Sequence, residues 1–161
     1  MLLLDRTGEI DDLWPAAGET LPEAGRIVVP LARLGEALDS DLEIGVDVPN
    51  NVDPKELTAH FGRIAMIAVD FPSFADGRGF SIARTLRSNG FLGRLRAEGP
   101  VISDQFTYLL QCGFDEVAIP EDVALRQPVS DWLAQLDLVT SGYQRGLEGR
   151  RSILDQRRGH A

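Results

Sequence analysis

The sequence has few of the residues that carry redox or metal chemistry. Among its 161 residues are one cysteine, Cys112, and two histidines, His60 and His160. One cysteine forms neither an internal disulfide nor a dithiol redox pair, which fits a reducing compartment. The three residues are too few for a His/Cys metal site, an axial haem pair or a cysteine-ligated iron–sulfur cluster. The spacings of a dinucleotide fingerprint and of a P-loop are also missing. We therefore expect no metal and no other cofactor, and we expect Cys112 to be a buried core thiol.

Long apolar runs and an excess of basic residues are lacking as well. The apolar runs are far shorter than the ~18 residues that a membrane span needs. The first four residues are apolar, but Asp5 follows at once without the positive region of a signal peptide. We therefore expect a cytoplasmic protein with no membrane contact. The net charge of −9 disfavours nucleic-acid binding, because neutralising phosphates needs a basic surface.

The length predicts one domain that buries roughly 70% of its unfolded surface. Residues 1–25 form an acidic lead-in with scattered proline and glycine, and residues 26–144 form the α/β domain. Residues 145–161 form an arginine-rich tail that we expect to be mobile or to order on a partner. An open sheet of this size has edge strands to protect, which makes a homodimer a reasonable expectation.

Strand and helix patterns alternate along the domain. The strands are predicted at 26–31, 42–48, 63–71, 92–97 and 116–119. The helices are predicted at 31–38, 53–61, 81–88, 103–113 and 130–144. Alternation with short links predicts an α/β fold of about five βα units with a mainly parallel sheet. Because a closed barrel needs eight such units, we expect an open three-layer or half-barrel-like arrangement. Trp14 and Trp132 are expected to be packing residues.

The most informative stretch is Phe71–Arg87, where two glycines flank an arginine between an apolar run and an amphipathic helix pattern. Glycines let backbone amides approach an anion closely, and the N-terminus of the following helix adds partial positive charge. Arg84 and Arg87 are three residues apart and share a helix face. We therefore predict an anion-binding corner made of Gly77, Arg78, Gly79, Arg84, Arg87 and Arg96. The alternative is that Asp76 and the glycines only make a turn beside solvated arginines.

Two carboxylates are candidates for general acid or base catalysis at the same sheet edge. Asp70 ends an apolar strand, and Asp104 and Gln105 open a helix. Ligands of open α/β sheets bind beyond the carboxyl ends of the strands. Asp70 needs a partner at a strand end, and Arg78 or Arg96 would serve. For Asp104 the alternative is that an acid in the first turn complements the helix dipole.

The stretch Phe71–Arg87, with Leu95–Gln105 and Cys112–Asp115 after it, resembles the core of a bacterial family catalogued as domain of unknown function 934. The resemblance covers about residues 26–144. Members are often labelled oxidoreductases of sulfite reduction, largely because their genes lie near that of the haem-containing sulfite reductase. Such a resemblance implies a role in assimilatory sulfur metabolism, with the sulfite reductase haemoprotein as a partner. The chain departs from the family at Gly93–Arg96, where members usually have Gly-Glu-Leu-Arg.

The sequence leaves three functions open. An oxidoreductase needs a redox centre, and the sequence shows none, so the first is an accessory protein of sulfite reduction that binds a small oxyanion. The second is a small enzyme acting on a phosphorylated or sulfated metabolite, with Asp70 or Asp104 as general acid or base. The third is a structural α/β domain without a ligand, in which arginines pair with Asp70 and Asp76. Convergence of Asp70, Arg78 and Asp104 on one pocket would favour the enzyme.

Overall fold

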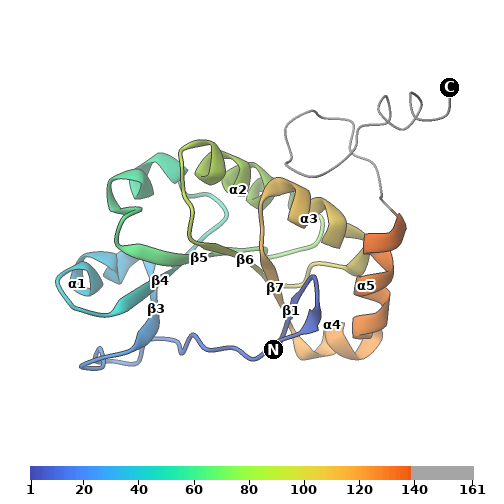
Figure 1. The fold of residues 1–161 in the computed structure, drawn as a ribbon, viewed down its shortest axis with the longest axis horizontal. Coiled ribbons are helices and arrows are strands. Elements are labelled where there is room, and N and C mark those ends of the chain that lie inside the picture. Colours follow the sequence, from blue (N-terminus) through green and yellow to red (C-terminus); the bar gives the residue numbers. More distant parts are fainter. Residues whose placement is uncertain (139–161) are drawn as a thin grey trace, which may run out of the picture.

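The computed structural model describes residues 1–138 and shows an open seven-stranded sheet (Figure 1). Its strand order is β2-β1-β7-β6-β5-β4-β3. The parallel strands follow one another in chain order as β3 (Arg26–Pro30), β4 (Glu43–Val48), β5 (Ile64–Asp70), β6 (Arg94–Glu98) and β7 (Glu116–Ile119). In a sequential sheet, right-handed crossovers all turn the same way and place the connecting helices on one face. The predicted open α/β fold with a mainly parallel sheet is confirmed.

The helical segments lie between and after these strands. They are η1 (Leu31–Arg33), α1 (Leu34–Leu38), η2 (Pro54–His60), α2 (Arg78–Ser88), η3 (Ser103–Gln105), α3 (Phe106–Cys112), α4 (Glu121–Arg126) and α5 (Val129–Leu138). The η segments are 3₁₀ helices. Helix α4 was not expected from the sequence, and α2 begins three residues before the predicted start. The end of the last predicted helix and the predicted tail, 145–161, lie outside the described residues.

The two faces of the sheet differ sharply in polarity. On β6, Leu95 and Ala97 are fully buried in the core between the sheet and the helices. Arg94, Arg96 and Glu98 alternate with them and therefore point to the opposite face, which we call the open face. Helices α2 and α3 cover the first face, and the N-terminal segment runs along the open face (Figure 1). The sheet is therefore open, with these helices on one face and a chain segment without helices across the other.

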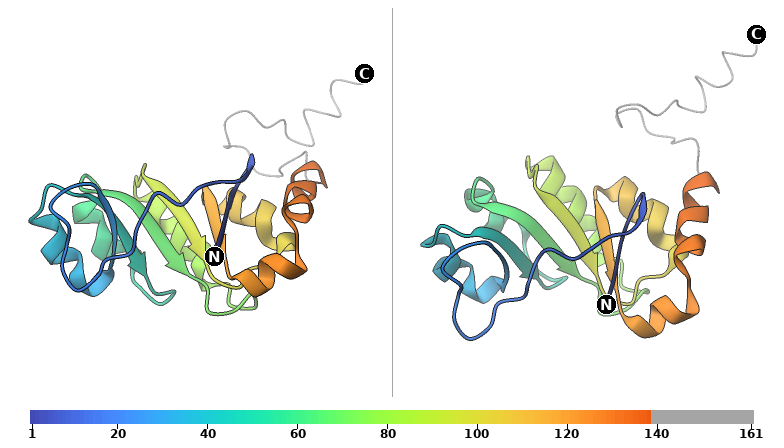
Figure 2. Two further views of the ribbon diagram at one scale, coloured as in Figure 1. Left: turned by 90° about the horizontal axis from the view of Figure 1, so that it is seen from below. Right: turned by 60° about the horizontal axis from the view of Figure 1, so that its bottom comes forward.

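The N-terminal segment joins the two edges of the sheet. Strand β1 (Leu2–Asp5) pairs antiparallel with β7, and β2 (Gly8–Glu9) pairs with β1. Residues 11–17, here called the strap, then cross the open face toward β3 (Figure 2). At that far edge the Ala17 amide donates to the Val28 carbonyl, and the Val28 amide donates to the Pro15 carbonyl, each at 2.8 Å. The strap therefore ends as a short addition to edge strand β3.

Within residues 1–138, no helix is long and apolar enough to cross a bilayer. Cys112, at the end of α3, is buried as expected. Burial raises the pKa of its thiol, although Arg84 and Tyr108 act in the opposite direction. The thiol is therefore protonated at neutral pH, and a protonated thiol is a poor nucleophile.

Candidate functional site

The loop before α2 carries its own anion. The carboxylate of Asp76 accepts hydrogen bonds from the Arg78 amide (3.1 Å) and from Arg78 Nη2 (2.7 Å). Asn50 Nδ2 donates to the same carboxylate at 2.8 Å. The bonds from Arg78 are the largest cause of a strongly lowered Asp76 pKa, and the Asp76 side chain is itself half-buried. Asp76 lies just before the N-cap Gly77, and its carboxylate thus binds the Arg78 amide that an external anion would use at the N-terminus of α2.

The two motif glycines have different surroundings. A Cβ on Gly79 would lie 2.6 Å from Cε2 of Phe71, so the absence of a side chain there lets α2 pack on the Phe71 ring. A Cβ on Gly77 would meet only Phe80 Cδ2, at 3.8 Å. Gly77 also has ordinary backbone angles, with φ −83°. Close packing therefore requires a glycine at position 79 and not at position 77.

Two further arginines of α2, Arg84 and Arg87, make different contacts. Arg87 donates hydrogen bonds to the carbonyls of Gly113 (3.0 Å), Phe91 (2.8 Å) and Gly93 (2.7 Å). Its Nη2 also pairs with Asp115 at 2.7 Å. Arg84 is exposed, and its guanidinium carbon lies 5.3 Å from the centroid of the Tyr108 ring. Arg87 therefore braces two loops against α2, whereas Arg84 lies on the surface.

The carboxylates proposed for catalysis do not share a cavity. Asp70 lines a cavity of about 520 Å³ with Asp47 at the carboxyl ends of β4 and β5, and Asp104 is not among its lining residues. Asp104 is exposed at η3. Gln105 donates from Nε2 to the Phe74 carbonyl at 2.8 Å, which ties the motif loop to the start of α3.

Arg96 lies on the open face and so is separated from the other residues of the predicted corner. It donates from Nε to Glu116 at 2.8 Å and from both Nη atoms to Asp12, each at 2.8 Å. Arg94 donates to the second oxygen of Glu116 at 2.5 Å. The Arg96 and Glu116 side chains are only 4% and 1% exposed. The structure thus does not bring the predicted corner together, and anion binding at Gly77–Arg87 stays a prediction.

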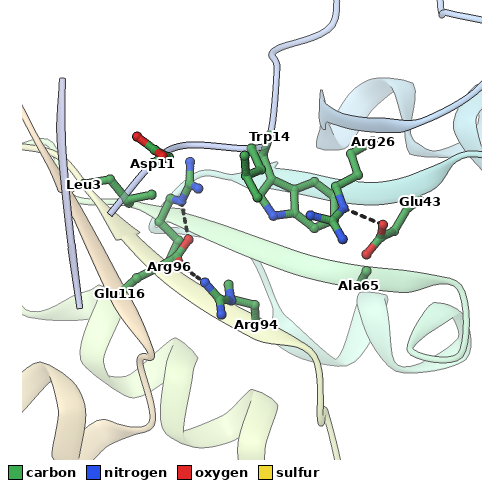
Figure 3. Close-up of a pocket in the computed structure, with 10 residues that line it drawn as sticks. Leu3, Asp11, Trp14, Arg26, Glu43, Ala65, Arg94, Arg96 and Glu116 are labelled. Carbon is green, nitrogen blue, oxygen red and sulfur yellow. Dashed lines mark hydrogen bonds and ion pairs between the residues drawn. The ribbon is translucent and has the colours of Figure 1, made fainter. Parts of the chain in front are cut away.

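The open face instead has a cavity of its own, of about 230 Å³ (Figure 3). The strap, strand β1 and the N-terminal halves of strands β3 to β7 form its walls. The cavity is lined by Leu3, Asp11, Leu13, Trp14, Arg26, Glu43, Ala65, Arg94, Arg96 and Glu116. Three arginines and three carboxylates balance, so the cavity is polar but carries no formal net charge.

Trp14 forms the strap side of this cavity. Its ring lies against the Gly45 backbone, where an added Cβ would be 3.2 Å from Trp14 Cε3. The Arg26 guanidinium carbon lies 5.4 Å from the ring centroid, and Arg26 Nε donates to Glu43 at 2.6 Å. Trp132 is fully buried as predicted, but Trp14 is a half-buried cavity wall. The packing role expected for Trp14 is therefore only part of its role.

A second cavity, of about 290 Å³, lies on the other side of Trp14 and Arg96. Asp47 and Glu98 line it at the carboxyl ends of their strands. Burial of the carboxyl and the nearby Asp70 charge raise the pKa of Asp47. Burial and the Asp47 charge raise the pKa of Glu98, with Arg96 acting in the opposite direction. This end of the open face therefore disfavours additional negative charge.

Arg26, Arg94 and Trp14 line the cavity of about 230 Å³ but are not among the site residues predicted from the sequence. Their best signal is the alternation Arg94-Leu95-Arg96-Ala97-Glu98, which places three charged side chains on one face of a central strand. A strand of this kind needs a polar covering, and the acidic strap supplies it. Only the fold shows that the strap crosses this strand and that Trp14 lies beside it.

The chain is thus an open α/β protein with helices on one face of its sheet. Polar cavities lie on the other face, beside the strap. The sequence model of a family described as bacterial protein of unknown function (DUF934) matches residues 45–154. The match covers more than half of the chain, so the chain belongs to this family, as the resemblance of its motifs implies. No curated protein and no solved structure matches the chain.

Proposed function

We propose that this protein is an accessory component of sulfite reduction that associates with the sulfite reductase haemoprotein. In this proposal it binds a small oxyanion in the open-face cavity of about 230 Å³, which we call the Trp14 cavity. The family resemblance supports the metabolic role and the partner. The chemistry of the cavity supports the ligand class. The enzyme alternative has less support, because Asp70 and Asp104 line no common cavity among those described.

The oxyanion proposal rests on the unused hydrogen-bond donors of Arg26 and Arg94. Arg26 donates one hydrogen bond to the Glu43 carboxylate, and Arg94 donates one to the Glu116 carboxylate. A guanidinium has five N–H donors, and within residues 1–138 neither side chain makes a further hydrogen bond. Both residues line the cavity, so several charge-assisted donors are available to an oxyanion there.

The balanced charge of the cavity sets the kind of anion that it accepts. Asp11, Glu43 and Glu116 offset the three arginines, so directed hydrogen bonds and not excess positive charge hold the ligand. A compact ion with several acceptor oxygens, such as sulfite, sulfate or phosphate, suits this arrangement. A polyanion would bring its remaining charges close to the carboxylates of the strap and of the strand ends.

Calorimetric and thermal-shift titrations with sulfite, sulfate and phosphate test this proposal, with FMN, FAD and NADPH as comparison ligands. An anion at one hundred times its dissociation constant should stabilise the protein by about 2.7 kcal/mol. Arg94→Gln and Arg26→Gln should each weaken binding by tenfold or more, about 1.4 kcal/mol. Arg126→Gln is the matched control, because Arg126 is an exposed arginine on α4 away from the cavity. Equal binding by all four proteins would overturn the assignment of the cavity.

A further inference from the structure

The half-buried Phe80 and the exposed Tyr108 pack together on the helix-covered side of the protein, with Arg84 beside Tyr108. Together with Phe74, an exposed residue of the loop that Gln105 ties to the start of α3, they make up what we call the aromatic–arginine patch. Phe74 is 54% exposed and Tyr108 is 44% exposed. The rings of Phe80 and Tyr108 lie 4.8 Å apart between centroids, and Arg84 stacks on Tyr108 at 5.3 Å. Aromatic residues and arginine are the side chains most enriched at the energetic centres of protein interfaces.

The patch is held in place by the core beneath it. Phe80 packs edge-on against the buried Phe71, with centroids 5.3 Å apart. Gln105 fixes the loop by donating to the Phe74 carbonyl. Helix α2 positions Arg84, and helix α3 positions Tyr108. A surface organised in this way loses little conformational entropy when a partner binds.

The charges at the patch indicate what kind of partner fits. Within residues 1–138, Arg84 has no carboxylate partner, whereas Arg78 is paired with Asp76 and Arg87 with Asp115. Arg84 is exposed, and its charged group stacks on the Tyr108 ring. The whole chain carries a charge of −9, so an acidic partner would be repelled over much of the protein and attracted at Arg84.

We propose that the aromatic–arginine patch is a docking surface for a protein segment that presents a carboxylate beside an apolar side chain. The carboxylate pairs with Arg84, and the apolar group covers Phe74 and Tyr108. A second copy of the chain fits less well, because a two-fold contact of the patch with itself would oppose two Arg84 side chains. The inference rests on the proposed association with the sulfite reductase haemoprotein and names the surface that this association uses.

The patch is the centre of the contact and not the whole of it. A stable protein interface buries about 1,200–2,000 Å² in total, which is more than four side chains provide. Truncating one central residue nevertheless commonly weakens binding by at least 2 kcal/mol, or about 30-fold. Arg84→Glu should exceed this, because it places a carboxylate opposite the carboxylate of the partner.

The test is the affinity of purified full-length protein for the sulfite reductase haemoprotein, measured by biolayer interferometry at two salt concentrations. Arg84→Glu and Tyr108→Ala should weaken binding at least 30-fold, and wild-type binding should weaken as salt rises. Arg126→Glu makes the same charge change at an exposed arginine on α4 and should bind as the wild type does. Urea unfolding checks that every variant is folded.

The possible results distinguish a wrong patch assignment from a wrong association with the haemoprotein. If the wild type does not bind the haemoprotein, the proposed association is wrong and the inference falls with it. If the wild type binds and the two patch variants bind equally well, the association stands and the patch assignment is wrong. Loss of binding in Arg126→Glu equal to that in Arg84→Glu would also overturn the assignment, because it would reflect total charge alone.

Discussion

Arg96 and Asp12 are 84 residues apart in the sequence and share two hydrogen bonds of 2.8 Å. The pair joins the middle of the sheet to the strap and separates the two cavities that flank Trp14. Arg96 is buried, and its third contact is with Glu116. A strap of acidic residues is therefore held over a sheet face that would otherwise expose a charged strand.

Asp12→Asn should loosen the strap and lower stability by about 1–2 kcal/mol, less than a fully buried hydrogen bond to a charged group contributes, because the Asp12 side chain is 45% exposed. Partial burial acts to raise the pKa of Asp12, but its bonds with Arg96 and Trp14 outweigh this and lower it from 3.8. The contribution is thus complete above pH 3.8 and is lost as pH falls below that value. Urea unfolding at neutral pH and at about pH 3 should show a smaller difference between wild type and variant at the acidic pH. A constant difference at both pH values would contradict this account.

Gly79→Ala and Gly77→Ala should differ although they lie two residues apart. The first places a methyl group against the Phe71 ring and should cost about 1–3 kcal/mol. The second has open space and allowed backbone angles, and it should change stability by less than about 0.5 kcal/mol. Thermal unfolding of both variants measures the difference. Equal losses would show that the loop, and not packing on Phe71, requires both glycines.

Arg87→Ala and Arg84→Ala form a second matched pair on one helix. Arg87→Ala leaves the carbonyls of Phe91, Gly93 and Gly113 without this donor and should destabilise the protein by about 2–3 kcal/mol. Arg84→Ala removes an exposed side chain and should stay within about 0.5 kcal/mol. Chemical denaturation measures both changes. A large loss in Arg84→Ala would assign that residue a structural role and weaken the docking proposal.

Asp47→Asn should stabilise the protein at neutral pH, in contrast to Asp12→Asn. Burial and the Asp70 charge raise the pKa of Asp47 above 3.8, so the folded state holds this proton more tightly than the unfolded state. The resulting stability is present below pH 3.8 and is lost as pH rises through the folded pKa. The variant should therefore gain stability relative to wild type as pH rises, and the two curves should meet in acid. Glu98→Gln, whose pKa is also raised, should behave in the same way.

The fold could be predicted because its signals are local. Residues 64–70 are a nearly continuous apolar run typical of a buried parallel strand, and β7 lies at the predicted residues, 116–119. Gly113, with φ +108°, ends α3 where the sequence indicates. Helix α4 was missed because its six residues, Glu121–Arg126, are too short for a clear period.

The site could not be predicted to the same degree, because its contacts join distant parts of the chain. Helical spacing correctly places Arg84 and Arg87 near one another on α2. It does not show that Arg87 is bonded to loops at Gly93 and Gly113 while Arg84 remains on the surface. The Trp14 cavity likewise depends on the strap crossing the sheet, a placement that only the fold reveals.

The most direct test of the proposed function is an NMR titration of the two tryptophan indole N–H signals with sulfite. Trp14 lines the cavity, whereas the indole of the buried Trp132 donates to the Gln127 carbonyl on the helix side at 3.2 Å. Binding in the cavity should shift the Trp14 signal saturably, leave the Trp132 signal unchanged, and need at least about tenfold more sulfite for half-saturation in Arg94→Gln. No shift of the Trp14 signal at saturating sulfite, or equal half-saturation concentrations in wild type and Arg94→Gln, would contradict the assignment of the cavity as an oxyanion site.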